Sequence, residues 1–410
     1  MKKLFFNLLV ISTALLSLNF VSCKNDSDPQ KDSVDILIEQ GVLTGKLDHA
    51  VTLDASVTYK LNGTFSVENG ASLTIPAGTT IKASEGYGSY IIVAQGGKIF
   101  VNGTASQPVI MTADNEASAS AGYWGGLILN GKAKISGQTG ITATGTCEMN
   151  PDYTYGGSDD ADNSGSITYL EIKYGGARSS AEVEHNGLTL DAVGSGTTIH
   201  DIYVYENADD GIEFFGGTVN VSNLLIVNPD DDMFDNTQGY RGTLTNCYGI
   251  WESGYTSTES DPRGVESDGN LDGLTPTDVN QTDFTITNMT IDLKLAYNAA
   301  TQATYMQDII KIRRGAKATI TNALVKGTGA IQDLIDMSDS KGAGTVDSSI
   351  SLTNGLTIPT SITGHEVTPG YITNTDGTKT YLTYPNVSAI ATGNTGCDTS
   401  IFAWTGYTGF

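Results

Sequence analysis

Acidic side chains recur at regular spacing in the middle of the chain. Asp231 follows Asp209 by 22 residues, and other acids flank both positions. The candidate metal ligands are Asp209, Asp210, Glu213, Asp230, Asp231, Asp232, Asp235, Glu266 and Asp268. If these positions superimpose, their carboxylates lie so close together that ionising all of them costs much free energy, unless a cation neutralises them. Ca²⁺, a hard cation that takes about six to eight oxygen ligands, suits such a set. A solvated acidic ridge with raised pKa values is the alternative.

A second acidic run forms a weaker candidate metal site. It contains Asp159, Asp160 and Asp162, followed by Gly165. The run resembles half of a calcium-binding loop, but no Glu follows at the spacing that an EF-hand requires. An ordinary polar turn is the alternative.

Basic and aromatic residues are candidates for ligand binding beside these acids. Repeat spacing predicts that Arg313 and Arg314 take the positions of Phe214 and Phe215, next to the acidic strip. The two arginines would line a carbohydrate groove, or would form ion pairs with the acids. Tyr240 and Trp251 also lie near the strip in sequence. Aromatic faces stack on sugar rings while carboxylates bind hydroxyls, but packing against a loop insertion is the alternative reading of both aromatics.

A catalytic use of the strip is also open, although no catalytic residue is assigned. Asp231 and Asp232 are candidates for the paired carboxylates of an inverting glycoside hydrolase. Arg313 is a candidate base for a polysaccharide lyase. The histidine expected of a polygalacturonase-like site is missing, because His185 and His200 precede the acids and no Gly-His-Gly follows them.

Internal repeats predict the elements that hold these residues. An aliphatic residue, a small polar residue and then Asn or Asp recur before apolar stretches, with copies at Ile199, Val221, Leu244, Ile286, Ile320 and Leu352. A unit of about 22 residues cannot close a sheet alone, so successive units must stack. We therefore predict an all-β fold, a right-handed single-stranded parallel β-helix (solenoid) over residues 34–410, with loop insertions at 248–284 and 291–310. A β-propeller is disfavoured because its blades need about 40–50 residues.

Two details follow from the predicted stacking. Asn223 and Asn246 occupy equivalent positions, which predicts an asparagine ladder that caps the backbone of the next coil. Cys247 falls in a core position. Residues Cys397 to Phe410 are expected to cap the last coil, because an open end would expose a pairing edge. Whether Cys147 and Cys397 form a disulfide is open.

The N-terminus predicts export. Residues 1–22 combine two lysines, an apolar stretch and a small residue before Cys23, as in a lipoprotein signal peptide. Cys23 is the expected lipidation site, and polar residues 23–33 form a flexible tether. Plain secretion is the alternative.

The composition of the chain limits the classes of molecule that it is expected to bind. The formal net charge is −24, and charged residues make up only 17% of the chain, whereas Gly is abundant at 48 residues. A polyanion repels phosphate backbones, so nucleic acid is excluded as an expected partner. Low charge with much Gly disfavours helical bundles and Rossmann-type folds.

Several stretches carry a family resemblance. They include Leu73–Thr79, Gly103–Thr112, Trp124–Leu129, Asp209–Asn220 and Asp230–Asp235. In these the chain resembles Bacteroidota cell-surface lipoproteins with a right-handed, pectate-lyase-like parallel β-helix domain. The resemblance implies the fold and a lipid anchor in the outer membrane facing the cell exterior, but no established activity.

Together these observations predict a surface lipoprotein whose calcium-stabilised β-helix binds extracellular polysaccharide or a host or cell-surface glycan, or mediates adhesion. An outer-membrane transport complex is a candidate partner. The alternatives are a polysaccharide lyase or glycoside hydrolase acting on an acidic or plant-type glycan, and a purely structural surface protein.

Overall fold

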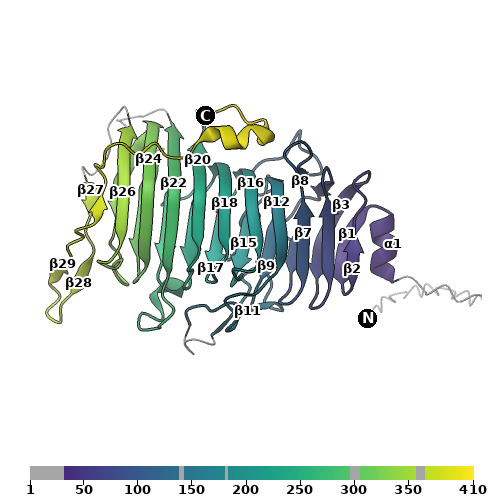
Figure 1. Cartoon of the computed structure of the whole chain (residues 1–410), viewed down its shortest axis with the longest axis horizontal. Coiled ribbons are helices and arrows are strands. Elements are labelled where there is room, and N and C mark those ends of the chain that lie inside the picture. The colour runs from purple at the N-terminus through teal and green to yellow at the C-terminus, as the bar shows by residue number, and fades with distance from the viewer. Residues whose placement is uncertain (1–31, 138–142, 181–182, 296–304, 357–364) are drawn as a thin grey trace, which may run out of the picture.

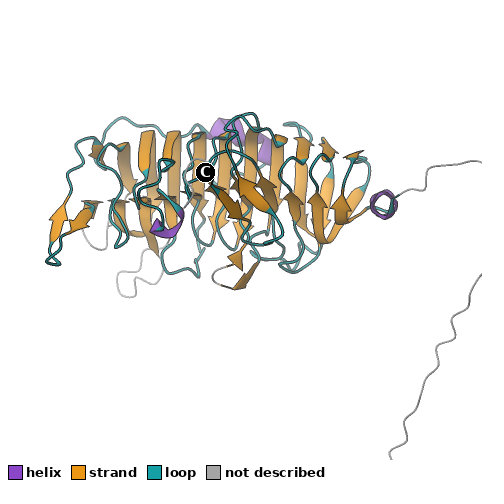
Figure 2. Ribbon diagram, turned by 90° about the horizontal axis from the view of Figure 1, so that it is seen from below, coloured by secondary structure: helices purple, strands orange, loops and turns teal. Residues whose placement is uncertain are grey.

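The computed structural model describes residues 32–137, 143–180, 183–295, 305–356 and 365–410. In these ranges the strands lie one beside the next along an extended rod (Figures 1 and 2). The 24 strands of the main sheet pair in parallel, and three two-stranded antiparallel sheets lie apart from them. The predicted fold class, an all-β parallel β-helix, is confirmed.

One face of the rod, called the site sheet here, carries the acidic residues. From one end to the other it consists of β6 (Ile91–Val93), β9 (Leu127–Asn130), β15 (Leu188–Asp191), β17 (Ile212–Phe215), β19 (Phe234–Thr237), β21 (Arg263–Asp268), β23 (Tyr305–Arg313), β25 (Ala330–Asp336) and β27 (His365–Thr368).

Longer strands form most of the rest of the rod. The remaining strands of the main sheet are β1 (Val42–Leu47), β2 (Ala50–Thr52), β3 (Thr58–Val67), β4 (Ser72–Pro76), β5 (Thr80–Ala83), β7 (Lys98–Asn102), β8 (Val109–Ala113), β12 (Gly165–Lys173), β16 (Thr198–Asn207), β18 (Asn220–Pro229), β20 (Thr243–Trp251), β22 (Asp283–Lys294), β24 (Lys317–Thr328), β26 (Ser349–Leu356) and β30 (Val387–Ser388). The small antiparallel sheets are β10 (Thr144–Thr146) with β11 (Thr154–Gly156), β13 (Arg178–Ser180) with β14 (Val183–Glu184), and β28 (Tyr371–Thr373) with β29 (Lys379–Tyr381).

The long strands turn a corner of the rod at a residue in the left-handed region. In β12, residues before Tyr169 pair with β7, and those after it pair with β8. Tyr169 itself has φ 49°. The equivalent residue in β18 is Asn223, with φ 59°. Asn tolerates this conformation better than other non-glycine residues, which explains its recurrence in the repeat.

The predicted asparagine ladder is present at this corner. Each Nδ2 donates to the side-chain oxygen one coil earlier: Asn223 to Asp201 at 3.0 Å, Asn246 to Asn223 at 2.9 Å, Asn288 to Asn246 at 2.9 Å and Asn322 to Asn288 at 2.8 Å. The bonds therefore join side chains to one another. The expectation that the ladder caps the backbone of the next coil is wrong. The predicted copy at Leu352 is out of step, because Ile350 and not Leu352 pairs with Ile320.

Removing one rung should weaken the rod. We expect Asn246→Ala to lower the free energy of unfolding by about 2–3 kcal/mol, because two amide hydrogen bonds are lost and Ala is strained at a φ of 58°. Asn246→Gly loses the same bonds without the strain and should cost less. Urea unfolding of both variants measures the difference; an Asn246→Ala protein as stable as wild type would contradict the expectation.

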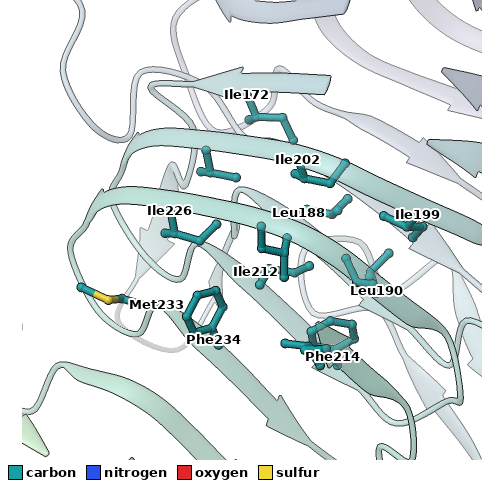
Figure 3. Packing of buried hydrophobic residues seen from close by; sticks show 14 of the residues in the cluster. Ile172, Leu188, Leu190, Ile199, Ile202, Ile212, Phe214, Ile226, Met233 and Phe234 are labelled. Atoms are coloured by element: carbon teal, nitrogen blue, oxygen red, sulfur yellow. The ribbon is translucent and has the colours of Figure 1, made fainter. Parts of the chain in front are cut away.

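Aliphatic and aromatic side chains fill the interior in columns. Figure 3 shows this packing around Ile202, Ile226, Ile212 and Phe234. Cys247 pairs in register with Leu224 and is fully buried, so its predicted core position is confirmed.

The first and last helices of the described residues cover different parts of the rod. Helix α1 (Ser33–Glu39) lies at one end of the rod, where Val34 and Ile38 join the core (Figure 1). The C-terminal segment, with the 3₁₀ helix η3 (Thr399–Thr405), does not cap the last coil. It packs instead on outward apolar residues of β16, β18 and β20. The expected end cap is therefore wrong.

Two further expectations are corrected by the strand bounds. The predicted insertion 248–284 contains β21, and the short 3₁₀ helix η2 (Leu271–Gly273) lies in what remains of it. The predicted insertion 291–310 overlaps the end of β22 and most of β23. Both loops are shorter than expected because paired strands extend into them. None of the helices in the described ranges has the length and apolarity to cross a lipid bilayer. The signal peptide and Cys23 lie outside the described residues.

Candidate functional site

Alternation along the site sheet places one charged residue per coil at the same outward position. Ile212 and Phe214 point into the core, and Glu213 between them points outward. Parallel register then aligns Glu213, Asp235, Glu266, Lys311 and Asp336 across five strands. Three residues earlier, the chain places a second set, Asp210, Asp232, Arg263, Asp308 and Asp333; the first two precede their strands, Arg263 begins β21, and the last two lie within β23 and β25.

These residues line an open cleft, called the acidic cleft here. Its volume is about 360 Å³. The lining consists of Glu148, Glu184, Asp209, Asp210, Glu213, Phe215, Asp231, Asp232, Asp235, Thr237, Asp261, Arg263, Glu266, Asp268, Leu271, Asp272, Arg313 and Arg314. Carboxylates outnumber the three arginines, so the cleft attracts cations.

Three groups of carboxylates converge in the cleft. In each group, one oxygen per residue lies within 4.8 Å of the others. The groups are Asp209 with Asp210 and Asp231, Asp210 with Glu213 and Asp235, and Asp232 with Asp235 and Glu266. The predicted superposition of distant acids is thus present, and it joins residues from neighbouring coils.

Part of this carboxylate set holds the backbone of the next coil. Asp210 accepts a hydrogen bond from the Asp232 backbone N–H at 2.9 Å, and Asp232 accepts one from the Arg263 backbone N–H at 2.6 Å. By contrast, Oδ1 of Asp231 and Oδ1 of Asp235 are buried and have no hydrogen-bond partner among the described residues. Two oxygens in the cleft are therefore left for a ligand.

Burial and mutual repulsion favour the protonated form of these acids. Burial first, and then neighbouring carboxylates, raise the pKa values of Asp209, Asp210, Glu213 and Asp232 well above the usual range. Burial raises the pKa of Asp231 to about 7 and that of Asp235 to about 6. The free cleft thus holds protons near neutral pH, and a bound cation would have to displace them.

Arginines compensate one end of the cleft. Arg263 is buried, contacts Glu266, and lies 2.6 Å from Asp261 and 3.8 Å from Asp232. Arg313 contacts Glu266 and Asp268. Burial and the two neighbouring arginines lower the pKa of Arg313 to about 10. The third carboxylate group therefore already has cationic partners, whereas the first two groups have fewer.

Asp268 and Asp230 do not belong to a converging group. Asp268 is held by Arg313 and by Arg314. Asp230 points away from the cleft and accepts a 2.7 Å hydrogen bond from the Thr258 backbone N–H. Their assignment as metal ligands is corrected, because each carboxylate already has strong partners elsewhere.

The positions predicted for the arginines are off by one residue. Ile312, not Arg313, takes the position of Phe214 in the register of the site sheet. Arg313 consequently points outward, as Phe215 does, and Arg314 follows the strand with φ 54°. Both arginines still reach the cleft, where they form ion pairs, the reading left as the alternative.

The weaker acidic run forms no metal site. Asp160 pairs with Lys134 at 2.7 Å and with Arg241 at 3.4 Å. Asp159 accepts the Ala161 backbone N–H, and Asp162 accepts the Ser164 hydroxyl. Among the described residues, these three carboxylates do not converge, so the polar turn is the correct reading.

The predicted aromatic ligand-binding residues are wrong. Tyr240 is fully buried, and its hydroxyl donates to the Val219 carbonyl at 2.8 Å. Trp251 is also fully buried and donates to the Pro229 carbonyl. Neither ring can reach a ligand, because both point into the core.

Other tyrosines line a neighbouring groove that the sequence did not reveal. This tyrosine groove has a volume of about 620 Å³ and is lined by Glu85, Gly86, Tyr87, Ser120, Ala121, Gly122, Ala177, Arg178, Ala208, Asp230, Tyr255, Thr256 and Thr258. Tyr87 is 56% exposed. Arg178 connects the groove to the acidic cleft, because it pairs with Asp230 at 3.4 Å and with Glu184 at 2.8 Å.

Sequence reasoning also missed Arg263, the central cation of the cleft. Its signal is its place three residues before Glu266, as Asp210 precedes Glu213. Glu148 and Glu184 come from segments outside the repeat and carry no such signal. Cys147 and Cys397 are free and buried in separate clusters, so they form no disulfide.

The fold and site define a parallel β-helix with an acid-lined cleft on one face. The family model described as "Pectate-lyase like beta helix domain" matches residues 45–408, and the chain belongs to this family. No curated protein and no solved structure matches it.

Proposed function

We propose that the protein is a glycan-binding module anchored through Cys23 to the outer face of the outer membrane, with a divalent cation, Ca²⁺, held in the acidic cleft. The observation that carries the proposal is the convergence of carboxylate oxygens from neighbouring coils, two of them without a hydrogen-bond partner among the described residues. A carbohydrate-related role also fits the pectate-lyase-like family. A purely structural surface protein is the alternative without a ligand.

The residues present fit a calcium ion. The donors are all carboxylate oxygens, which hard cations prefer. Asp210 with Glu213 and Asp235, and Asp209 with Asp210 and Asp231, are the best candidates, because both groups contain a partnerless oxygen and neither contains Glu266, which the arginines neutralise. A bound Ca²⁺ would neutralise these acids and offer coordination positions to sugar oxygens.

The tyrosine groove supplies the second half of a sugar site. The exposed ring of Tyr87 suits stacking on a sugar face, and Arg178 lies in the lining of the same groove. Because Arg178 and Glu184 join groove and cleft, one extended polysaccharide would occupy both.

Binding to a polysaccharide panel that includes polygalacturonate tests this function. We expect binding in Ca²⁺ that is lost in EDTA and restored by Ca²⁺. Tyr87→Ala should weaken binding by about tenfold through loss of the aromatic contact. Tyr381→Ala, which removes a similarly exposed tyrosine on β29, is the control and should bind normally. Absence of binding across the panel would contradict the proposal.

The lowered pKa of Arg313 favours a second candidate, a polysaccharide lyase with Arg313 as base. The same panel distinguishes it: lyase action releases unsaturated products, detected by their ultraviolet absorbance, and Arg313→Lys should reduce the rate more than the affinity. Binding without product release favours the glycan-binding module.

A further inference from the structure

A second group of acids lies outside the acidic cleft, between two coils farther along the rod. Asp308 on β23 pairs in register with Asp333 on β25, and Asp336 follows on the same strand. One oxygen of each lies within 4.8 Å of the other two. Their exposures are 1%, 2% and 5% respectively. None of the three lines the cleft.

Asp308 is the unusual member of this group. Both of its carboxylate oxygens are buried, and neither has a hydrogen-bond partner in the described part of the chain. The nearest cationic nitrogens, Lys311 Nζ and Arg263 Nε, lie 3.7 Å away, beyond hydrogen-bond distance. A buried carboxylate without hydrogen bonds is costly, so its environment calls for a ligand.

The two nearby cations are shared with other carboxylates, although Arg263 Nε has no hydrogen-bond partner among the described residues and lies 3.7 Å from Asp308. Lys311 contacts Asp336, and Arg263 serves Asp261, Glu266 and the Gln307 amide. Lys311 and Arg263 are thus shared among several carboxylates, and the oxygens of Asp308, Asp333 and Asp336 converge beside them. Three converging carboxylate oxygens suit a divalent, oxygen-ligated cation.

We propose that Asp308, Asp333 and Asp336 form a second cation site, which takes a divalent, oxygen-ligated ion of the Ca²⁺ type and ties β23 to β25. The site is structural, because its ligands are buried between coils and leave no room for a polysaccharide. Lys311 competes with the ion for the same carboxylates, so its charge lowers the affinity of the site.

Calcium titration calorimetry of the full chain after EDTA treatment tests the site. Asp308→Asn should remove one binding event and keep the binding event of the cleft, whereas the double variant Asp231→Asn, Asp235→Asn, which changes both candidate groups of the cleft, should do the reverse. This pair separates failure of the second site from failure of the cleft. An Asp308→Asn protein that binds as many Ca²⁺ ions as wild type would overturn the assignment.

Lys311→Met provides a test that does not depend on the folding of the Asp308 variant. Removing the competing ammonium should raise Ca²⁺ affinity at this site at least about fivefold. It should also enlarge the rise in melting temperature on adding Ca²⁺. If Lys311 is instead the permanent counterion, Lys311→Met lowers the melting temperature and Ca²⁺ does not restore it, which overturns the proposal.

Discussion

Replacing Arg263 with Met should lower the free energy of unfolding in EDTA by about 3–5 kcal/mol. Arg263 is 4% exposed, and its guanidinium lies among Asp232, Asp261, Glu266 and Asp308. Its removal takes away a cation that these acids share and leaves, among the described residues, only Arg313 beside Glu266 and Lys311 beside Asp308. Buried charges with too few partners destabilise the folded state. Urea unfolding in EDTA measures the loss, and added Ca²⁺ should recover part of it by neutralising the same acids.

Lys317→Met is the matched control for this variant. Lys317 pairs with Asp283 at 3.0 Å, but both side chains are well exposed, so the expected loss is below about 1 kcal/mol. Equal losses for the two variants would mean that the cleft acids are already neutral without Arg263. In that case protonation, and not Arg263, would neutralise these carboxylates.

Without metal, the protein should lose stability as the pH rises from about 4 to about 7. Asp231 and Asp235 have folded pKa values of about 7 and about 6, above the ordinary value of 3.8. The folded state therefore binds more protons than the unfolded state in this window, and the free energy of unfolding falls as pH increases. Since a shift of one pKa unit corresponds to about 1.4 kcal/mol, the combined loss is on the order of several kcal/mol.

Calcium should reverse this trend, because metal binding needs ionised carboxylates. The rise in melting temperature on adding Ca²⁺ should be small at about pH 5 and large at about pH 8. In the double variant Asp231→Asn, Asp235→Asn, both the pH dependence and the Ca²⁺ effect should shrink. A wild-type melting temperature in EDTA that increases from pH 4 to pH 7 would contradict the assignment of raised pKa values.

The fold was predictable because the repeat records two separate constraints. Aliphatic residues such as Val221 and Leu244 mark the core column, and Asn223 and Asn246 mark a left-handed corner that few other residues tolerate. Both patterns remain recognisable when a loop is inserted between coils, because each copy of the pattern lies within a single coil. The convergence of Asp210 and Asp232 followed from the same period.

The predictions for individual side chains were wrong where the repeat period does not determine whether a side chain points into the core or outward. A shift of one residue reverses the face of a strand, so Arg313 was placed at the position of Phe214, which Ile312 occupies. Tyr240 lies beside the acids in sequence, but its ring turns inward and stacks on Phe214, with ring centroids 4.3 Å apart. Tyr87, which lines the groove, comes from a distant coil and has no neighbouring acid run to mark it.

The C-terminal segment packs on strands that come much earlier in the chain, not on the last coil of the rod. Residues from Cys397 onward return to the middle and cover Tyr203, Leu225 and Tyr248. Because the chain is synthesised from its N-terminus, the apolar residues of β16, β18 and β20 are exposed to water until residues 397–410 follow. Residues 397–410 must therefore be synthesised before this apolar surface is covered, and a chain that lacks them would expose it to other molecules.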